Sequence, residues 1–251
     1  MTVFLFGPFA SAVGHADSLP DNAAWEETWT RVLERFVNDK GRIDFAGLAA
    51  DRSAIDKVVA FVGALSPSST PDRFPTRDAT LSYYINAYNA LAMHGVLASG
   101  SLERFSLIGR IRFFVVKRVT VGSRRLSLYS LENDVIRPLG EERIHFALNC
   151  MVVGCPRLPR AAFRTATLGR QLDRAAREFV NEARNVRVDA AAKTVWLSAI
   201  FDFYTGDFLD KAPTLIDYVN RYRSDPVPQG YQVRFLDYDW TINRQPPAQS
   251  R

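Results

Sequence analysis

The hydrophobic spacing of the chain changes near Gly100, and this change limits the folds that the sequence can adopt. Before Gly100, apolar residues recur at intervals of three and four, which is the pattern of amphipathic helices. Helices are therefore expected at 22–38, 53–65 and 79–97, with the last as a central helix. After Gly100, short runs of branched residues flank turn residues, as in β-hairpins. Helices and antiparallel strands in separate runs predict an α+β fold.

Two hairpins are expected beyond Gly100. In the first, Gly122 and Ser123 form a two-residue connection between the runs 113–121 and 125–128. The remaining expected elements are a hairpin of 186–188 with 194–197, helices at 130–137, 168–183 and 212–222, and strands at 143–149 and 232–236. The predicted architecture is a central helix with surrounding helices packed on a small antiparallel sheet, which the hairpins build.

Composition narrows the class of protein further. Of the 251 residues, 47% are hydrophobic and 24% are charged, a balance typical of globular proteins that excludes extensive disorder. The 13 prolines and 14 glycines follow no fixed period, so collagen-like and solenoid folds are excluded. Two cysteines cannot build a disulfide scaffold, and with only three histidines they leave little room for a metal centre. We therefore expect no metal and no other cofactor.

The net charge of +5 is concentrated in two arginine-rich stretches, 104–125 and 157–177. Either stretch could contact a phosphate or an anionic membrane surface. A solvated basic face is the favoured interpretation, because no motif of interleaved aromatic and basic residues accompanies the charge. For the same reason we do not expect nucleic-acid binding.

The amino terminus resembles the end of a secretory signal. Residues 3–13 carry no charge, and Gly14 and Ala16 supply small residues where a signal peptidase reads them. The run is shorter than the roughly 20 residues that a membrane span needs, so no transmembrane anchor is expected. We therefore expect residues 1–16 to be a signal peptide and the protein to be exported, to the periplasm or outside the cell. The alternative is a short buried amino-terminal strand.

The expected domain organisation follows from this amino terminus and from the composition of the carboxyl terminus. Residues 17–243 are predicted to form a single α+β domain. The proline-containing residues 244–251 are predicted to form a flexible tail.

The segment 143–156 holds both cysteines of the chain and one of its three histidines. If its first half is a strand, His145 points to one face and Cys150 to the other. Cys155 lies beyond Gly154, and glycine permits the tight turn that would bring this thiol back toward the imidazole. A Cys–His pair generates the thiolate, which is the reactive form of cysteine.

A carboxylate or amide on the second ring nitrogen would orient the imidazole, and Glu132 on the preceding helix can supply it. Three alternatives stay open. Cys150 could be a small buried hydrophobic residue, Cys150 and Cys155 could form a disulfide in an exported protein, or the segment could belong to a metal site, which we rank last.

Asn86 and Asn89 lie three residues apart on the central helix and therefore share a face. Buried amides need hydrogen-bond partners, and an asparagine donor can stabilise the oxyanion of acyl transfer. They could equally bind loop backbone and hold the fold together. His94 lies off this face and is interpreted as structural.

Four blocks of the sequence resemble the domain-of-unknown-function 547 family. They are Tyr84–Leu91, Ser127–Glu132, His145–Cys150 with Gly154–Pro156, and Tyr238–Asn243. Their order and spacing match from Trp25 to Asn243. Some members of this family look like cysteine-dependent peptidases with a Cys–His core.

The resemblance implies Cys155 as the nucleophile, His145 as the base and Glu132 as the residue that orients it, with Asn86 and Asn89 near the site. The chain departs from the usual family pattern. It has Gly154 where members usually have serine, Arg157 where they have a second proline, and Asn133 where they tend to have histidine.

Two functions follow as expectations. The leading one is an exported cysteine-dependent acyl-transfer enzyme of the Cys-His-Glu type, peptidase-like, which hydrolyses an amide or an ester of a small-molecule or peptide substrate. The rival is a non-catalytic binding or interaction module, in which the Cys–His segment is structural and the arginine stretches contact an anionic partner.

Overall fold

The central helix is buried on almost every side. In the computed structural model, which describes residues 21–100 and 103–246, this helix is α4 (Arg77–Ala98). Its first turn is capped by Thr76, whose side chain accepts a hydrogen bond from the backbone N–H of Ala79 at 3.1 Å. A helix that is apolar all round must lie inside a core, and α4 runs through the first of two hydrophobic cores.

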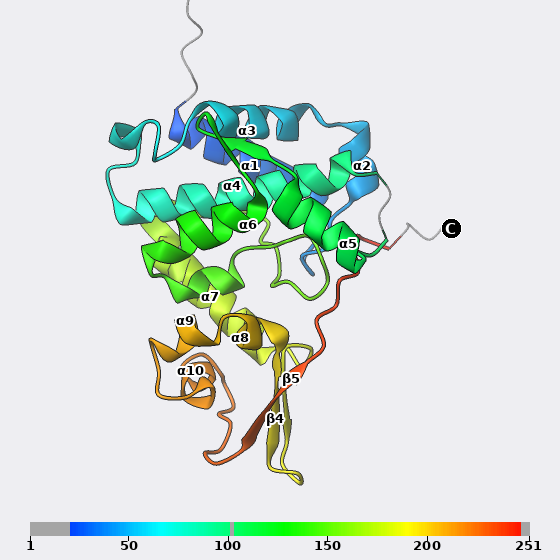
Figure 1. Cartoon of the computed structure of the whole chain (residues 1–251), viewed down its shortest axis with the longest axis vertical. Coiled ribbons are helices and arrows are strands. Elements are labelled where there is room, and N and C mark those ends of the chain that lie inside the picture. Colours follow the sequence, from blue (N-terminus) through cyan, green and yellow to red (C-terminus); the bar gives the residue numbers. More distant parts are fainter. Residues whose placement is uncertain (1–20, 101–102, 247–251) are drawn as a thin grey trace, which may run out of the picture.

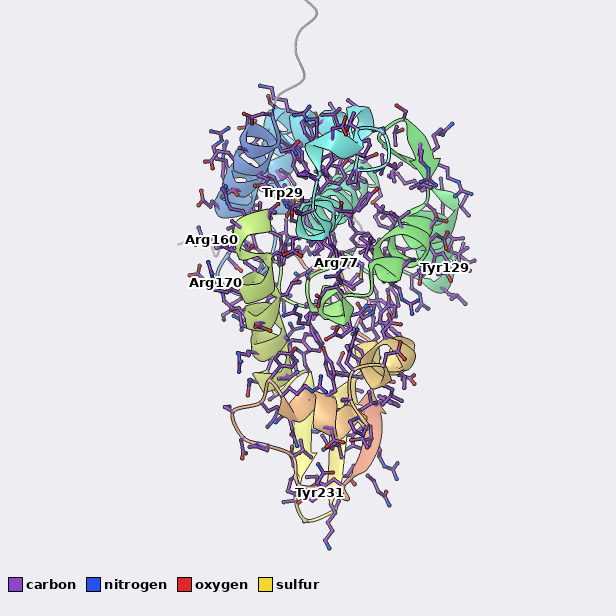
Figure 2. All side chains as sticks on the ribbon, turned by 90° about the vertical axis from the view of Figure 1, so that its left-hand side faces the viewer. Trp29, Arg77, Tyr129, Arg160, Arg170 and Tyr231 are labelled. Carbon is purple, nitrogen blue, oxygen red and sulfur yellow. The ribbon has the colours of Figure 1, made fainter. Side chains whose placement is uncertain are left out.

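Three helices cover α4: α1 (Asn22–Phe36), α2 (Phe45–Ala50) and α3 (Ser53–Ala64). Trp25 of α1 stacks on Phe61 of α3 with ring centroids 5.1 Å apart, and its indole N–H donates to the carbonyl of Val58. Figure 1 shows these helices together at one end of an elongated molecule, and Figure 2 shows Trp29 inside this helical layer. The predicted helices in this region are confirmed.

The first hairpin forms at the predicted turn but is shorter than expected. Strands β1 (Val119–Val121) and β2 (Arg124–Leu126) pair antiparallel, and Gly122 and Ser123 both have positive φ angles, of 52° and 73°. The type of turn that joins two strands through two residues requires this left-handed backbone.

The strand predicted from residue 113 is wrong. Residues Leu107–Arg110 form α5, and Ile111–Val116 continue it as a π-helical turn, η2. Phe113 packs inside the first core, whereas Val115 and Val116 point outward and are 44% and 61% exposed. The branched side chains that favoured a strand therefore lie on an exposed helix face, where β propensity does not decide the structure.

A second core lies at the other end of the molecule. It is built by β3 (Val186–Asp189), β4 (Thr194–Ser198), β5 (Gln232–Leu236), α8 (Ala199–Phe203), α9 (Thr205–Leu209) and α10 (Leu215–Asn220). Helix α7 (Leu168–Asn181) joins the cores, because Leu168 and Leu172 pack in the first and Phe179 packs in the second.

The second sheet is mixed. Strands β3 and β4 form the predicted antiparallel hairpin, but β5 lies parallel to β4, with Val233 opposite Val195. A parallel pair needs a long crossover, here supplied by α8, α9 and α10. The α+β fold class is confirmed, whereas a sheet built from hairpins alone is not.

The strand predicted at 143–149 is also wrong. Its first half is a 3₁₀ turn, η5 (Glu142–Phe146), and the rest is irregular. Ile144 packs in the first core and Phe146 in the second. The alternation that favoured a strand reflects two cores on opposite sides of the segment. The other short elements are η1 (Pro71–Arg73), α6 (Leu128–Ser130), η3 (Leu131–Ile136), η4 (Arg137–Leu139) and η6 (Thr165–Thr167).

The predictions for the termini meet the structure only in part. The signal peptide expected at 1–16 lies outside the described residues. At the other end, the backbone N–H of Gln245 donates to the carbonyl of Ile43 at 2.8 Å, and Arg244 pairs with Glu103 at 3.0 Å. The start of the expected tail is therefore held against the first core. None of the helices within 21–100 and 103–246 has the length and hydrophobicity that crossing a bilayer requires.

Candidate functional site

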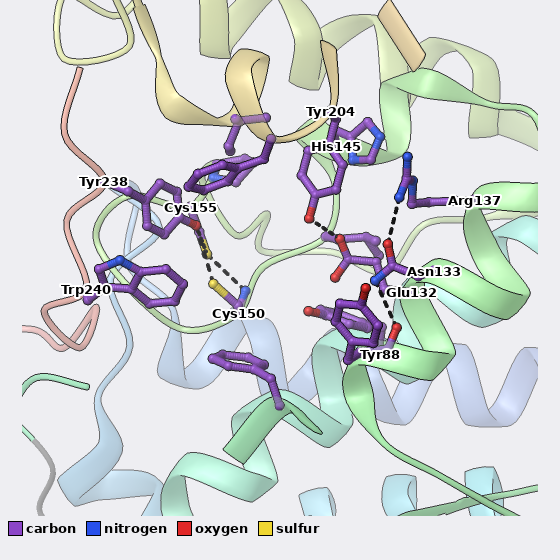
Figure 3. Close-up of a pocket in the computed structure, with 16 residues that line it drawn as sticks. Tyr88, Glu132, Asn133, Arg137, His145, Cys150, Cys155, Tyr204, Tyr238 and Trp240 are labelled. Carbon is purple, nitrogen blue, oxygen red and sulfur yellow. Dashed lines mark hydrogen bonds between the residues drawn. The ribbon is translucent and has the colours of Figure 1, made fainter. Parts of the chain in front are cut away.

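A cavity of about 380 Å³ lies where the two cores meet. Aromatic side chains form much of its lining, and they come from both cores: Tyr88 from α4 in the first, and Tyr204 beside the second. Cys150, Cys155, His145 and Glu132 line the same cavity. All three predicted catalytic residues, Cys155, His145 and Glu132, therefore lie around one space (Figure 3).

The loop that carries the two cysteines is held by the buried side chain of Asn149. Its amide donates to the carbonyl of Pro156 at 2.6 Å and accepts from the N–H of Met151 at 2.7 Å. Met151 has a φ angle of 67°, a left-handed conformation that a non-glycine residue adopts only when its surroundings impose it. The bonds of Asn149 close the loop at both ends.

The C-terminal segment 237–244 covers this loop. The N–H groups of Val153 and Gly154 donate to the carbonyls of Thr241 and Asp239 at 2.8 and 2.9 Å. A Cβ atom at Gly154 would lie 3.0 Å from the Asp239 nitrogen and from the Tyr238 ring, so a larger residue here would require the segment to shift by a few tenths of an ångström. The close packing of the segment places the Tyr238 hydroxyl against the thiols.

Both cysteines are free, and their sulfur atoms share the Tyr238 hydroxyl. The hydroxyl lies 3.2 Å from Cys155 Sγ and 3.4 Å from Cys150 Sγ. The backbone N–H of Cys150 donates to Cys155 Sγ at 3.0 Å. The prediction that Cys150 points away from the site is wrong, because its segment is not a strand and both thiols line the cavity. We call residues 149–156 together with Tyr238 the thiol wall.

The environment of the two thiols separates their pKa values. Burial works to raise the pKa of Cys155, but hydrogen bonds from Cys150 and Tyr238 outweigh burial and hold it below the ordinary value. The pKa of Cys150 is raised by its hydrogen bond to Cys155 and by burial. Cys155 is therefore the thiol that ionises more readily, which is what a nucleophile requires.

His145 lines the same cavity and is held by Arg137, which precedes it by eight positions, and by two residues far from it in the sequence, Tyr204 and Asp207. Its Nε2 lies 2.8 Å from Asp207 Oδ2, and its ring stacks on Tyr204 with centroids 3.8 Å apart. Arg137 binds the same carboxylate through Nε and Nη2 at 2.9 and 2.8 Å. We call Arg137, His145, Tyr204 and Asp207 the histidine wall.

The charges of the histidine wall show which atom donates in the hydrogen bond between His145 and Asp207. The pKa of Asp207 is held far below its ordinary value by the hydrogen bonds from His145 and from Arg137, so the carboxyl group is ionised. An ionised carboxylate only accepts, so the Nε2 atom of His145 must donate. In the neutral imidazole, the basic nitrogen is then Nδ1.

Glu132 lines the cavity but does not contact His145. Its carboxylate accepts a hydrogen bond from the Tyr204 hydroxyl, and Asp207 occupies the orienting position that the sequence assigned to Glu132. Among the described residues, no hydrogen bond joins Cys155 to His145 either. The predicted Cys-His-Glu chain of contacts is thus replaced by two separate walls.

Asn86 and Asn89 do not line the cavity. The amide of Asn86 makes two hydrogen bonds with the backbone of Phe163, at 2.7 and 2.9 Å. The amide of Asn89 donates to the carbonyl of Ala147 and accepts from the N–H of Asn149 at 2.7 Å. These bonds favour the alternative in which both asparagines hold the fold, and Asn89 does so directly beneath the thiol wall.

Two π-helical turns contribute residues to the cavity. Phe114 comes from η2, and Glu132 and Asn133 come from η3. A π-helical turn re-aims side chains relative to a regular helix and occurs often at functional sites. The predicted helix at 130–137 did not indicate this geometry.

Sequence reasoning missed several residues of the site. Asp207 lies 62 positions from His145 and Tyr204 lies 72 positions from Glu132, and neither stands in a motif that would have marked it. Tyr238 belonged to one of the four family-like blocks but had no assigned role. His94, interpreted as structural, binds Asp56 at 3.1 Å and does not line the cavity.

The fold and the cavity together define an α+β protein with two free thiols facing a His–Asp pair. In a comparison with protein families, residues 72–180 match the family described as "Protein of unknown function, DUF547". This match supports the family assignment that the sequence blocks before residue 180 indicated. Neither the curated proteins nor the solved structures contained a match to the chain. The family match ends before the residues Tyr204, Asp207 and Tyr238.

Proposed function

We propose that the cavity is the active site of a cysteine-dependent acyl-transfer enzyme, in which Cys155 attacks an amide or ester carbonyl. The observation that carries this proposal is the geometry around Cys155 Sγ, which lies 3.0 Å from the backbone nitrogen of Cys150 and 3.2 Å from the Tyr238 hydroxyl, in the cavity that His145 also lines. These surroundings hold the pKa of Cys155 below its ordinary value although the side chain is buried. Burial alone would favour the neutral thiol. The donors from Cys150 and Tyr238 therefore favour the reactive form, as expected for a nucleophile.

The proposed reaction has two steps. The Cys155 thiolate forms a C–S bond to the carbonyl carbon, and the Tyr238 hydroxyl turns from the sulfur to the developing oxyanion. Protonated His145 donates its proton to the leaving nitrogen or oxygen as the acyl bond breaks. Water then attacks the carbonyl carbon of the thioester, and neutral His145 accepts a proton from that water. The C–S bond breaks, the carboxylic acid is released, and Cys155 is again a thiolate.

The two walls would act across the substrate, and not through a direct Cys–His bond. The cavity volume of about 380 Å³ leaves room for the reacting group between Cys155 and His145. Hydrogen bonds of catalytic residues are often long before a substrate is bound. Asp207 would keep the imidazole in the tautomer that presents Nδ1.

Acylation by p-nitrophenyl acetate tests this proposal. We expect one equivalent of p-nitrophenol in a fast phase and an acetyl group on Cys155, identified by peptide fragmentation mass spectrometry. His145→Ala should slow the hydrolysis of this thioester by roughly a hundredfold, whereas Cys150→Ala should still be acylated at Cys155. Acylation at Cys150, or no thioester in a folded protein, would overturn the assignment.

A binding module is the second candidate, and one observation favours it. No hydrogen bond joins Cys155 to His145 among the described residues, and both side chains are almost fully buried. In that case the cavity would hold a small ligand between aromatic rings without chemistry. The same acylation experiment separates the two, because a binding module forms no thioester.

We also propose that the protein is exported, on the strength of the uncharged residues 3–13 and the small residues that follow. The intact mass of protein purified from its native host tests this. A chain that begins at Asp17 supports export, and a chain in the cytosol that retains residues 1–16 overturns it.

A further inference from the structure

We propose that Glu132 binds a cationic group of the substrate, an ammonium or a guanidinium joined to the acyl group by a short aliphatic chain. This inference rests on the proposed function, since it names the class of substrate for the same cavity. It begins from a carboxylate that is buried, faces the cavity and forms no ion pair with any residue that the structure describes.

Glu132 is 9% exposed, and its one side-chain hydrogen bond within the described residues is accepted from the neutral Tyr204 hydroxyl. The neighbouring cation, Arg137, is engaged elsewhere. Its guanidinium makes two hydrogen bonds to Asp207 and a third to the Asn133 side chain at 2.7 Å. A buried carboxylate without a cation is costly, and a cationic ligand would offset that cost.

The surroundings of Glu132 suit a cation. Tyr88 and Tyr204 lie close enough that the negative charge of Glu132 adds to the effect of burial in raising their pKa values. The faces of aromatic rings attract cations, and Phe114 adds another ring to the lining. The Trp240 ring of the same lining already carries the guanidinium of Arg110, 4.4 Å from its centroid. Arg137 and Asp207 pair with each other, so the carboxyl group of Glu132 is an acidic side chain of the lining that has no ionic partner among the described residues.

The position of Glu132 relative to the thiols sets the shape of the substrate. Figure 3 shows the side chains of Glu132 and Cys155 at different sides of the same cavity. With its cation bound at Glu132, the substrate would place its aliphatic part between the aromatic rings. Its carbonyl group would then lie at the sulfur of Cys155. The amides and esters of basic amino acids have this arrangement.

Charge-selective thiol reagents test the inference without knowledge of the substrate. Methanethiosulfonates with a 2-aminoethyl or a 2-sulfonatoethyl group differ in charge and react alike. The thiolate forms an S–S bond with the sulfenyl sulfur, and methanesulfinate leaves with the electron pair. Rates are measured for Cys155 in a Cys150→Ala background and divided by the rates of the same reagents with a small free thiol.

We expect the corrected rate of the cationic reagent to exceed that of the anionic one by about tenfold or more. Glu132→Gln should remove most of this ratio, and Glu132→Asp should retain part of it. The control is Asp134→Asn, which removes one negative charge from the exposed side of the same turn and should leave the ratio unchanged. An equal ratio in the parent and in Glu132→Gln would overturn the inference.

A second measurement covers the case in which Glu132→Gln does not fold. In the parent protein, 1-butylammonium should protect Cys155 from iodoacetamide at a concentration at least tenfold lower than 1-butanol. Equal protection by the two would overturn the role of Glu132 and leave the nucleophile untouched. If Cys155 instead reacts no faster than a free thiol, the proposed function is wrong. The role of Glu132 is then tested separately, by measuring the binding of butylammonium with NMR.

A separate observation supports a second proposal, that the helix 107–116 docks on an anionic phospholipid surface. Five large aliphatic side chains of this one helix are between 44% and 79% exposed: Leu107, Ile108, Ile111, Val115 and Val116. Residues 107, 111 and 115 share one face because they are four apart. A soluble surface seldom exposes so many neighbouring apolar side chains.

The charge beside this face is positive. Arg112, Lys117 and Arg118 are exposed, and none of them forms an ion pair within the part of the chain that the structure describes. An apolar helix face bordered by cations is the pattern of helices that lie in the headgroup region of an anionic bilayer. Phe114 of the same helix lines the cavity, so docking would bring the surface near the site.

Vesicle co-sedimentation tests this proposal on the whole chain. We expect at least tenfold tighter binding to vesicles of equal amounts of phosphatidylcholine and phosphatidylglycerol than to phosphatidylcholine alone. The pair Ile108→Asn and Val116→Asn, and separately the pair Arg112→Gln and Arg118→Gln, should each weaken binding about tenfold. Leu209→Asn, at a 43% exposed leucine elsewhere, is the matched control.

Three results would overturn the proposal. They are equal binding to both kinds of vesicle, equal loss in the Leu209→Asn control, and a dimer in size-exclusion chromatography that Ile108→Asn with Val116→Asn dissociates. The last result would make this face an interface between two copies of the chain.

Discussion

The thiol wall and the histidine wall face one cavity, but neutral hydrogen bonds hold the first and charged groups hold the second. In the thiol wall, Asn149 bonds the backbone at both ends of a short loop, and Tyr238 and a backbone N–H contact the sulfur of Cys155. In the histidine wall, Asp207 lies between His145 and Arg137. Neutral donors keep their hydrogens across the pH range of most experiments. The carboxylate of Asp207, in contrast, must be ionised to accept the hydrogen bonds of His145 and Arg137.

This difference implies that the two walls fail in different ways. The thiol wall should lose its structure when an amide or hydroxyl group is removed, and the size of this loss should depend little on pH. The histidine wall should fail when Asp207 is protonated or replaced. Because the walls share no hydrogen bond among the described residues, damage to one should leave the other measurable.

The largest expected effect is the loss of Asn149. Asn149→Ala would leave the N–H of Met151 and the carbonyl of Pro156 without partners inside the protein. We expect the free energy of unfolding to fall by about 3 kcal/mol, because two buried backbone groups lose their hydrogen bonds. Urea unfolding measures it, with Gln229→Ala at an exposed amide as the control. A loss equal to that of the control would show that the thiol wall does not depend on this side chain.

A smaller and pH-dependent loss is expected for Asp207→Asn. At neutral pH the free energy of unfolding should fall by about 2 kcal/mol, because Arg137 and His145 lose a charged partner. The folded-state pKa of Asp207 is depressed, so its stabilisation is complete above the unfolded value of about 3.9 and is lost as the pH falls below it.

Unfolding of Asp207→Asn and of the parent protein is therefore compared at neutral and at acidic pH. The difference between them should shrink toward acidic pH. The control is Asp210→Asn, at an exposed carboxylate on the next turn. A difference that stays constant as the solution is acidified would refute the assigned role of the Asp207 charge.

The smallest expected effect sharpens the assignment of Cys155. Tyr238→Phe removes one donor from the sulfur and should raise the pKa of Cys155, so that its alkylation at neutral pH slows roughly fivefold. His145→Ala should change that rate less than Tyr238→Phe does, since no hydrogen bond joins the two walls. The measurement is the rate of alkylation against pH. A larger effect of His145→Ala would show that the walls are coupled through a direct Cys–His pair.

Much of the secondary structure was predictable, because it depends on neighbours along the chain. The helices at α1, α3, α4 and α7 and the turn at Gly122 follow from local spacing and local backbone geometry. The failures at 113–118 and 143–149 have one cause. In both places the apolar pattern was set by the surroundings, a free surface in the first and two cores in the second, and not by the local backbone.

The residues of the site divide in the same way. Local spacing identified the two cysteines, His145 and Glu132 as chemically able groups close in sequence, and two of the four family-like blocks contain Glu132 and Tyr238. Only the tertiary structure decided that Asp207, and not Glu132, binds His145, and that Tyr238 binds Cys155 from 83 positions away. A hydrogen bond between distant segments leaves no periodicity in either segment. Its partners are known only when the cores, here joined by α7, have brought the segments together.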